Sequence, residues 1–361
     1  MVYKRVSGPP SPGTIIMGAP TTSFSGLNMT APLGATLRIA IAGAGMGGLA
    51  TALALAQSGF THVDVYEAAS DLGFVGAGIQ IAPNLARQLQ WLGVWEHMAD
   101  EAVEIQEASI LASATNEELA NVRLTQIEER YGQPHRVAHR SALANALYKG
   151  CKDAAPRVTL HFDTAVVGVD FDENRIQLKE RDEEGDGRWA AADVILGADG
   201  IKSVVRKCML ARHGEAEDAQ DTGQAAYRIM LHCDQIAHDP ELLALVDSNL
   251  TFRWIGPRRH IIVRTFAWDY KQLTSAPSPQ AYPISGRKIL NVSTAQPDAH
   301  FAAAPTASWT ARADKSAMQA VFTDFCPLVA RMLACVPSGT CASRSCAYTA
   351  RSRRGSRGAL R

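Results

Sequence analysis

A run of six residues near the first apolar stretch constrains this chain more than any other feature. The run GAGMGG at positions 43–48 has the spacing GxGxxG. The apolar segment Leu37–Ala42 before it predicts a buried strand, Gly45–Gln57 predicts a helix, and His62–Glu67 predicts a second strand. A strand, a helix and a strand within about thirty residues indicate a βαβ unit. The chain is therefore expected to build an α/β fold around a parallel sheet.

The glycines of this run suit a bound phosphate. In this spacing Gly43 permits the tight turn, Gly45 lets the backbone approach a pyrophosphate, and Gly48 lets the helix pack on the strand. The N-terminus of the helix then presents free N–H groups and the positive end of its dipole. Glu67 ends the second strand, where a carboxylate can bind ribose hydroxyls. We predict a dinucleotide site; the alternative is a glycine-rich turn beside a surface glutamate.

Charge and cysteine content exclude several classes of protein. The 361 residues hold 36 Lys and Arg against 36 Asp and Glu, so a whole-chain electrostatic case for nucleic-acid binding fails. Seven cysteines without a CxxC pair argue against a disulfide scaffold or a zinc module, and they favour a reducing compartment. Ten histidines without an HExxH motif give no support for a metal site. We expect a cytoplasmic protein without a metal.

One segment is long and apolar enough to resemble a membrane span. Ile39–Ala56 contains four glycines and starts too far along the chain for a signal peptide. A membrane span is the alternative to the strand, turn and helix described above. We predict that no segment of the chain spans a membrane.

The pattern along the chain divides it into four parts. Residues 1–36 are rich in Gly, Pro, Ser and Thr and are expected to form a disordered leader. Residues 37–212 mix strands and helices, whereas strand patterns dominate residues 213–335. Residues 336–361 contain six arginines and no acidic residue, and we predict an unstructured basic tail. A nucleic-acid-binding tail is one alternative, and a frame-shifted end of the chain is the other.

Three further motifs follow the glycine run in a defined order. They are GAGIQ at residues 76–80 followed by Pro83-Asn84, then His139-Arg140, then GADG at residues 197–200 with Ser203 and Arg206. Together they resemble the single-component FAD-dependent aromatic monooxygenases of the salicylate-hydroxylase type. The resemblance runs from about Leu37 to Leu333.

This resemblance implies a fold and a set of site residues. The fold would be a Rossmann-like FAD-binding domain at residues 37–212 and a sheet-rich substrate domain at residues 213–335, with a C-terminal part missing. The FAD contacts would be Gly43, Gly45, Gly48, Glu67, Ala77, Gly78, Arg140, Asp199 and Gly200. Arg206 would support the GADG loop. On the substrate side, Arg228 would hold a carboxylate or phenolate and Tyr282 would face the substrate ring, although a core tyrosine is nearly as well supported.

The resemblance also implies an activity. The enzyme would use FAD, with NAD(P)H and O₂ as co-substrates, to hydroxylate or oxidatively decarboxylate a small aromatic that is phenolic or carboxylated. Two alternatives stay open: a truncated, non-catalytic remnant of such an enzyme, and an FAD oxidoreductase that acts on a non-aromatic substrate.

Two departures from the family pattern bear on this expectation. Residues 263–280 separate His260-Ile261-Ile262 from Ala281-Tyr282-Pro283, which the family pattern joins directly. A retained intron and an authentic surface loop both explain this insertion. The chain also ends without the late Gly-Asp motif that holds the ribityl and phosphate groups of FAD in the family, so whether this polypeptide retains FAD is left open.

Overall fold

The computed structural model describes residues 36–72, 78–216, 220–267, 288–300, 314–337 and 342–348. All of them belong to a single unit, Gly34–Arg361. The predicted βαβ unit is confirmed, with strand β1 at Arg38–Ala42, helix α1 at Met46–Gln57 and strand β2 at His62–Tyr66. The helix ends before Gly59, whose φ is +95°.

 At Gly43, where the glycine run begins, φ is +97°. Both angles lie in the left-handed region that favours glycine.

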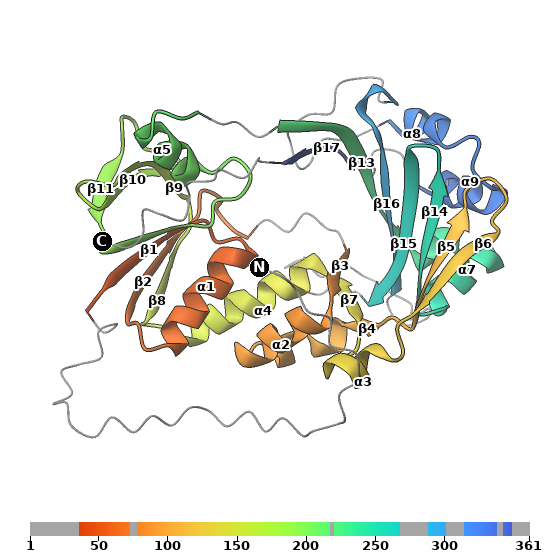
Figure 1. The fold of residues 1–361 in the computed structure, drawn as a ribbon, viewed down its shortest axis with the longest axis horizontal. Coiled ribbons are helices and arrows are strands. Elements are labelled where there is room, and N and C mark those ends of the chain that lie inside the picture. The colour runs from red at the N-terminus through yellow and green to blue at the C-terminus, as the bar shows by residue number, and fades with distance from the viewer. Residues whose placement is uncertain are drawn as a thin grey trace, which may run out of the picture. The chain divides into compact units, whose positions relative to one another are not determined.

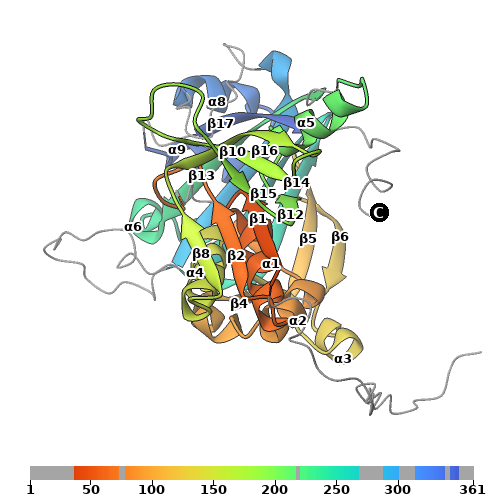
Figure 2. The same cartoon turned by 90° about the vertical axis from the view of Figure 1, so that its left-hand side faces the viewer.

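The two strands of this unit form the centre of a four-stranded parallel sheet, in the order β12-β1-β2-β8. Strand β8 spans Val158–His161 and β12 spans Val194–Gly197. Residues 39–42 of β1 are all buried, which is typical of a parallel strand covered on both faces. One face packs against α1 and α4 (Arg140–Asp153) in a core that includes Leu49 and Leu147. Figure 2 shows β1, β2 and β8 side by side.

A three-stranded antiparallel sheet contributes to the core on the other side of β1 and β2. Its order is β11-β10-β9, with β9 at Thr164–Asp170, β10 at Arg175–Glu180 and β11 at Arg188–Ala191. Ile176 and Leu178 of β10 pack with Ala40 and Tyr66 of the parallel sheet. Residues 171–174 form the turn between β9 and β10.

A seven-stranded sheet dominates the second half of the chain, in the order β17-β13-β16-β15-β14-β5-β6. Neighbouring strands are antiparallel except for the parallel pair β14 and β5. The strands are β5 (Glu107–Ala112), β6 (Glu118–Arg123), β13 (Gln220–His232), β14 (Leu250–Gly256), β15 (Arg259–Ala267), β16 (Lys288–Pro297) and β17 (Ala342–Tyr348).

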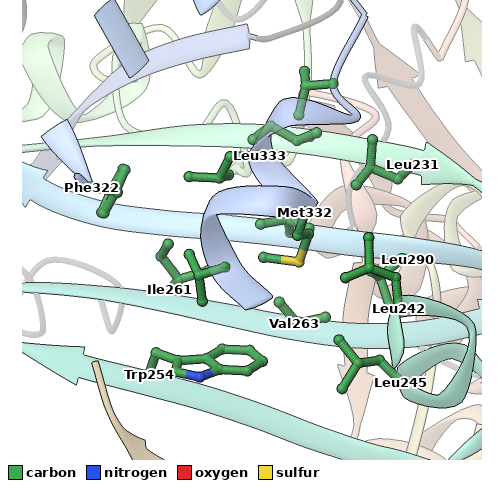
Figure 3. Close-up of a cluster of buried hydrophobic side chains, with 14 of the residues drawn as sticks. Leu231, Leu242, Leu245, Trp254, Ile261, Val263, Leu290, Phe322, Met332 and Leu333 are labelled. Carbon is green, nitrogen blue, oxygen red and sulfur yellow. The ribbon is translucent and has the colours of Figure 1, made fainter. Parts of the chain in front are cut away.

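Helices cover one face of this sheet, which we call the core face (Figure 1). They are α6 (Cys233–Ile236), α7 (Pro240–Asp247), α8 (Lys315–Val321) and α9 (Pro327–Ala334). Figure 3 shows Trp254, Ile261 and Val263 of the sheet facing Met332 of α9. Helices α7 and α8 begin after Asp239 and Asp314, whose carboxylates accept hydrogen bonds from N–H groups of the first turn.

A small sheet, β3-β7-β4, lies at one end of the opposite face, which we call the second face. Strand β3 spans Gly78–Ile81, β4 spans Val103–Glu104 and β7 spans Arg136–His139. Val137 of β7 is buried together with Ile105 and with Ile289 of β16. The other helices are α2 (Pro83–Trp91), α3 (Ile127–Tyr131) and α5 (Val204–Arg212), with 3-10 turns η2 (Trp95–His97), η3 (Ala99–Glu101) and η6 (Asp298–His300).

The topology refines the division predicted at residue 212. Strands β5 and β6 lie within residues 37–212, yet they extend the sheet formed by β13 to β17. The predicted unstructured tail is wrong for residues 342–348, because they form β17 and pair with β13. An edge strand needs a partner for its backbone N–H and C=O groups, and an apolar pattern is not required for that pairing. The rest of the four-part division stays a prediction.

Part of the inserted segment also belongs to the sheet. Strand β15 continues through residues 263–267 of this segment, and this half of β15 pairs with β16. Val263 and Thr265 are buried, so they contribute to the core face rather than to a surface loop. Residues 268–280 lie outside the described part of the chain.

Candidate cofactor-binding site

The glycine run forms a turn between β1 and α1 in which two glycines are required by the chain itself. A Cβ atom at Gly43 would lie 2.6 Å from the carbonyl oxygen of Ala198. A Cβ atom at Gly48 would overlap the carbonyl oxygen of Gly43. Both contacts are with backbone, which cannot move aside as a flexible side chain can. The predicted roles of Gly43 in the turn and of Gly48 in close packing therefore agree with the structure.

Gly45 differs from these two glycines. It precedes α1 with an ordinary φ of −64°, and no atom of the described residues lies within 4 Å of the position a Cβ would take. Neither backbone strain nor crowding explains a glycine there. Open space above the turn is what the approach of a pyrophosphate needs. No side chain caps the first turn of α1 and no acidic residue lies in it, so its N–H groups suit an anion.

Glu67 follows β2 and lies against the glycine turn. Its carboxylate accepts hydrogen bonds from the N–H of Ala44 at 2.9 Å and from the N–H of Ala69 at 3.0 Å. The carboxylate is half-buried, and it bridges the turn after β1 to the turn after β2. The structure thus brings together two features that the sequence separates by about twenty residues, as expected for this fold. Its contact with ribose stays a prediction.

The GADG motif lies beside the same turn because β12 pairs with β1. Gly197 is the register partner of Ala42, so Ala198 directly faces Gly43. Gly200 has a φ of +76° and provides the sharp turn that follows. The guanidinium of Arg206 donates to the carbonyl of Ile201 at 2.6 Å and to that of Gly200 at 3.4 Å. The prediction that Arg206 supports this loop is confirmed.

Asp199 has a structural task in this loop. Its carboxylate accepts from the hydroxyl of Ser203 at 2.5 Å and from the N–H groups of Val204 and Val205 at 2.6 and 3.1 Å. These bonds satisfy the first N–H groups of α5, which a helix leaves unpaired. The predicted FAD contact of Asp199 is untested, and the carboxylate is committed to α5 in this structure.

A second segment of predicted cofactor contacts is built by the pairing of β3 with β7. Gly78 is the register partner of His139, and Arg140 follows as the exposed first residue of α4. Arg140 therefore directly follows the residue that pairs with Gly78. Ala77 lies outside the described residues. The FAD contacts of Gly78 and Arg140 stay predictions.

The N-terminal cap of α4 is His139. The Nδ1 atom of His139 accepts from the N–H of Ser141 at 3.2 Å. His139 is buried, and burial lowers its pKa to about 4, so the ring is neutral at pH 7 and can act as this acceptor. In the sequence, the histidine directly before Arg140 could have indicated this cap, because a nitrogen of a neutral imidazole can accept the hydrogen bond that the usual polar caps accept.

The predicted substrate-side residues are only partly visible. Arg228 lies on β13 and is exposed on the second face of the seven-stranded sheet. Tyr282 lies outside the described residues. Sequence reasoning missed three other cationic or titratable residues on this face, namely Arg253, His260 and Arg264. Alternating apolar and polar residues in 260–265 were the signal, since they place His260 and Arg264 opposite the core face.

Two surface cavities lie away from these residues. One has a volume of about 630 Å³ beside α7 and α9 and is lined by His238, Arg331 and Cys335. The other has about the same volume, 630 Å³, and lies at the charged turn between β10 and β11, lined by Arg181 and Arg188. Neither is lined by a predicted site residue.

Comparison with known proteins agrees with this geometry. A family model described as FAD binding domain matches residues 36–313, well over half of the chain. The chain belongs to this FAD-binding-domain family. Among its relatives, an FAD-dependent monooxygenase of a Nectria species is 30% identical over 278 residues, which cover 77% of this chain and 57% of that one. A 3-hydroxybenzoate 6-hydroxylase of Klebsiella oxytoca is 30% identical over 227 residues, covering 63% and 53%.

Solved structures support the fold. HpxO of Klebsiella pneumoniae, complexed with FAD and uric acid, has a TM-score of 0.62 at 20% identity and covers 86% of this chain and 68% of that one. The tetrameric form of 2-methyl-3-hydroxypyridine-5-carboxylic acid oxygenase has a TM-score of 0.61 at 21% identity, covering 87% and 70%. The chain spans a little over half the length of the two curated relatives. Within the described residues, no helix is long and apolar enough to cross a membrane.

Proposed function

We propose that this chain acts as an FAD-dependent monooxygenase that uses NAD(P)H and O₂ to hydroxylate, or oxidatively decarboxylate, a small phenolic or carboxylated aromatic. The observation that carries the proposal is the open space at Gly45, beside Glu67 and the uncapped N-terminus of α1. The names of the relatives, which include hydroxybenzoate hydroxylases and FAD-dependent monooxygenases, support the same reaction class.

The chain's own residues would divide the work. The N–H groups at the start of α1 would bind the pyrophosphate of FAD, and Gly45 would let it approach. Glu67 would accept from ribose hydroxyls, while Gly78 and Arg140 would lie along the rest of the cofactor. When bound, FAD supplies the redox chemistry by which O₂ oxidises the substrate. Arg228 would orient an anionic group of the substrate by charge-assisted hydrogen bonds.

The proposed location is the cytoplasm. Five cysteines of the described residues are free thiols, and one of them, Cys151, is buried with a pKa raised by burial to about 12. Free thiols suit a reducing compartment. A thiol with so high a pKa is inert, so no redox role is assigned to it.

The visible spectrum of the purified chain tests the proposal. We expect a flavin spectrum after gel filtration in the presence of FAD, and NAD(P)H oxidation that a phenolic or carboxylated aromatic stimulates. Glu67→Gln should lower the flavin content, whereas the matched control Glu96→Gln, at an exposed position in η2, should not. A colourless wild-type chain would favour the non-catalytic alternative. Flavin without stimulation by any aromatic would favour an oxidoreductase for a non-aromatic substrate.

A further inference from the structure

The second face of the seven-stranded sheet carries arginines from three strands in adjacent rows. Strand register places Arg264 of β15 between Thr251 of β14 and Asn291 of β16. In the next row, Arg253 of β14 is opposite Ile262, Ile262 is opposite Ser293, and Ser293 is opposite Arg228 of β13. Arg264 is therefore diagonal to Arg253, at the roughly 7–8 Å typical of such pairs.

Arg264 is the most enclosed of these cations. Its Nε atom is buried and has no hydrogen-bond partner among the residues that the structure describes. Its flanking residues Thr251 and Asn291 are polar and buried. A buried charge is costly unless it is paired and hydrogen-bonded. The surroundings of Arg264 therefore suit a ligand that brings both a negative charge and hydrogen-bond acceptors.

The groups that act electrostatically on Arg264 and its neighbours are other cations and histidines. The pKa of Arg264 is lowered by burial and then by the nearby Arg253. The pKa of His135 is lowered by burial and then by Arg264, and that of His260 by burial and then by Arg253. None of these causes is a carboxylate. The two arginines thus form a positively charged patch with Arg264 at its buried end, and the neutral rings of His135 and His260 lie beside it.

We propose that Arg264 and Arg253 form an anion subsite that binds the carboxylate of an aromatic substrate, separate from the contact predicted for Arg228. This inference rests on the proposed function and deepens it. A guanidinium matches a carboxylate with two parallel hydrogen bonds, and the Thr251 hydroxyl and Asn291 amide flank that position. Strands lie about 4.8 Å apart, so Arg228 on β13 is roughly 10 Å across the sheet from β15. The ring would then lie over Ile262 and Ser293, between Arg228 and the subsite of Arg253 and Arg264.

The experiment is equilibrium binding of 3-hydroxybenzoate and of its neutral analogue 3-hydroxybenzamide to the full chain, by isothermal titration. We expect the acid to bind more tightly than the amide. Arg264→Met should weaken binding of the acid roughly tenfold to hundredfold and leave binding of the amide unchanged. Arg264→Lys keeps the positive charge but not the paired N–H donors of the guanidinium, so it should weaken binding of the acid less than Arg264→Met does. The control Arg130→Met, on the exposed surface of α3, should change neither.

Several results would overturn the subsite. They are equal binding of acid and amide by the wild-type chain, no measurable binding of the acid, or wild-type affinity for the acid in both folded Arg264 variants. A loss of FAD affinity without a loss of acid affinity would assign the patch to phosphate of the cofactor, and would also reject it. Flavin content separates the two proposals. A yellow chain whose acid binding ignores Arg264 rejects only the subsite, and a colourless chain that binds the acid through Arg264 rejects only the proposed function.

Discussion

The parallel sheet and the seven-stranded sheet present their candidate sites in opposite ways. At the parallel sheet, Gly43, Gly45 and Gly48 come from one continuous turn, and Glu67 joins them from the next strand of the same βαβ unit. On the seven-stranded sheet, Arg228, Arg253 and Arg264 come from three strands and meet only through register. The binding role of a local motif can be predicted from the sequence, whereas that of a sheet face built from distant strands becomes visible only in the folded structure.

The largest expected effect concerns the core of the seven-stranded sheet. Trp254 is 0% exposed, and its indole N–H donates to Asn116 at 2.7 Å. Trp254→Ala should lower the free energy of unfolding by about 3–5 kcal/mol, because it leaves a cavity and an unpaired amide. Urea denaturation followed by circular dichroism measures this. Trp189→Ala is the matched control, since Trp189 is 44% exposed and its loss should cost far less. Equal losses would contradict the assigned core.

The next effect separates two glycines of one turn. Gly43→Ala should lower the free energy of unfolding by about 2 kcal/mol or more, because its φ of +97° and the Ala198 carbonyl both exclude a side chain. Gly45→Val should leave stability nearly unchanged and abolish measurable FAD binding. Urea denaturation and titration with FAD test the two variants in parallel. A stable Gly43→Ala protein, or undiminished FAD affinity in Gly45→Val, would break the distinction between a structural and a binding glycine.

The third effect is a pH dependence at the cap of α4. Burial lowers the pKa of His139 from 6.5 to about 4, so the unfolded chain binds the proton more readily than the folded one. The contribution of neutral His139 to stability is present above pH 6.5 and is lost as the pH falls from 6.5 towards 4. Between pH 7 and pH 5 we expect a loss of about 2 kcal/mol in the free energy of unfolding.

His139→Asn provides the comparison for this pH effect. Asparagine keeps a side-chain acceptor at the cap but does not titrate in this range. The difference in urea stability between pH 7 and pH 5 should therefore shrink by about the amount assigned to His139. An unchanged difference would mean that other groups set the acid sensitivity of this region.

How much the sequence could predict follows the same contrast. The βαβ unit and the approach of Glu67 to the glycine turn were predictable, because short connections and period-3.6 or buried-strand patterns define them locally. The parallel pairing of β5 with β14 was not, since these strands are far apart in sequence and no local pattern states which edges meet. The strand β17 was missed for a related reason, because backbone pairing at the edge of β13 requires no apolar repeat.

The smallest effect decides the role of Asp199, where a motif predicted to contact FAD also caps a helix. Asp199→Ala should lower the free energy of unfolding of the FAD-free chain by about 1–2 kcal/mol, because the N–H groups of Val204 and Val205 lose their acceptor. Ser203→Ala, which removes the partner hydroxyl and the Oγ that accepts from Arg206, should cost about 1 kcal/mol. If Asp199 acts only through α5, the two variants should lose FAD affinity in proportion to stability. A much larger loss of FAD affinity in Asp199→Ala, at equal stability, would show a direct contact with the cofactor. That result would place Asp199 with Gly45 and Glu67 in the binding site. The turn after β12 would then be a second local motif of the cofactor site.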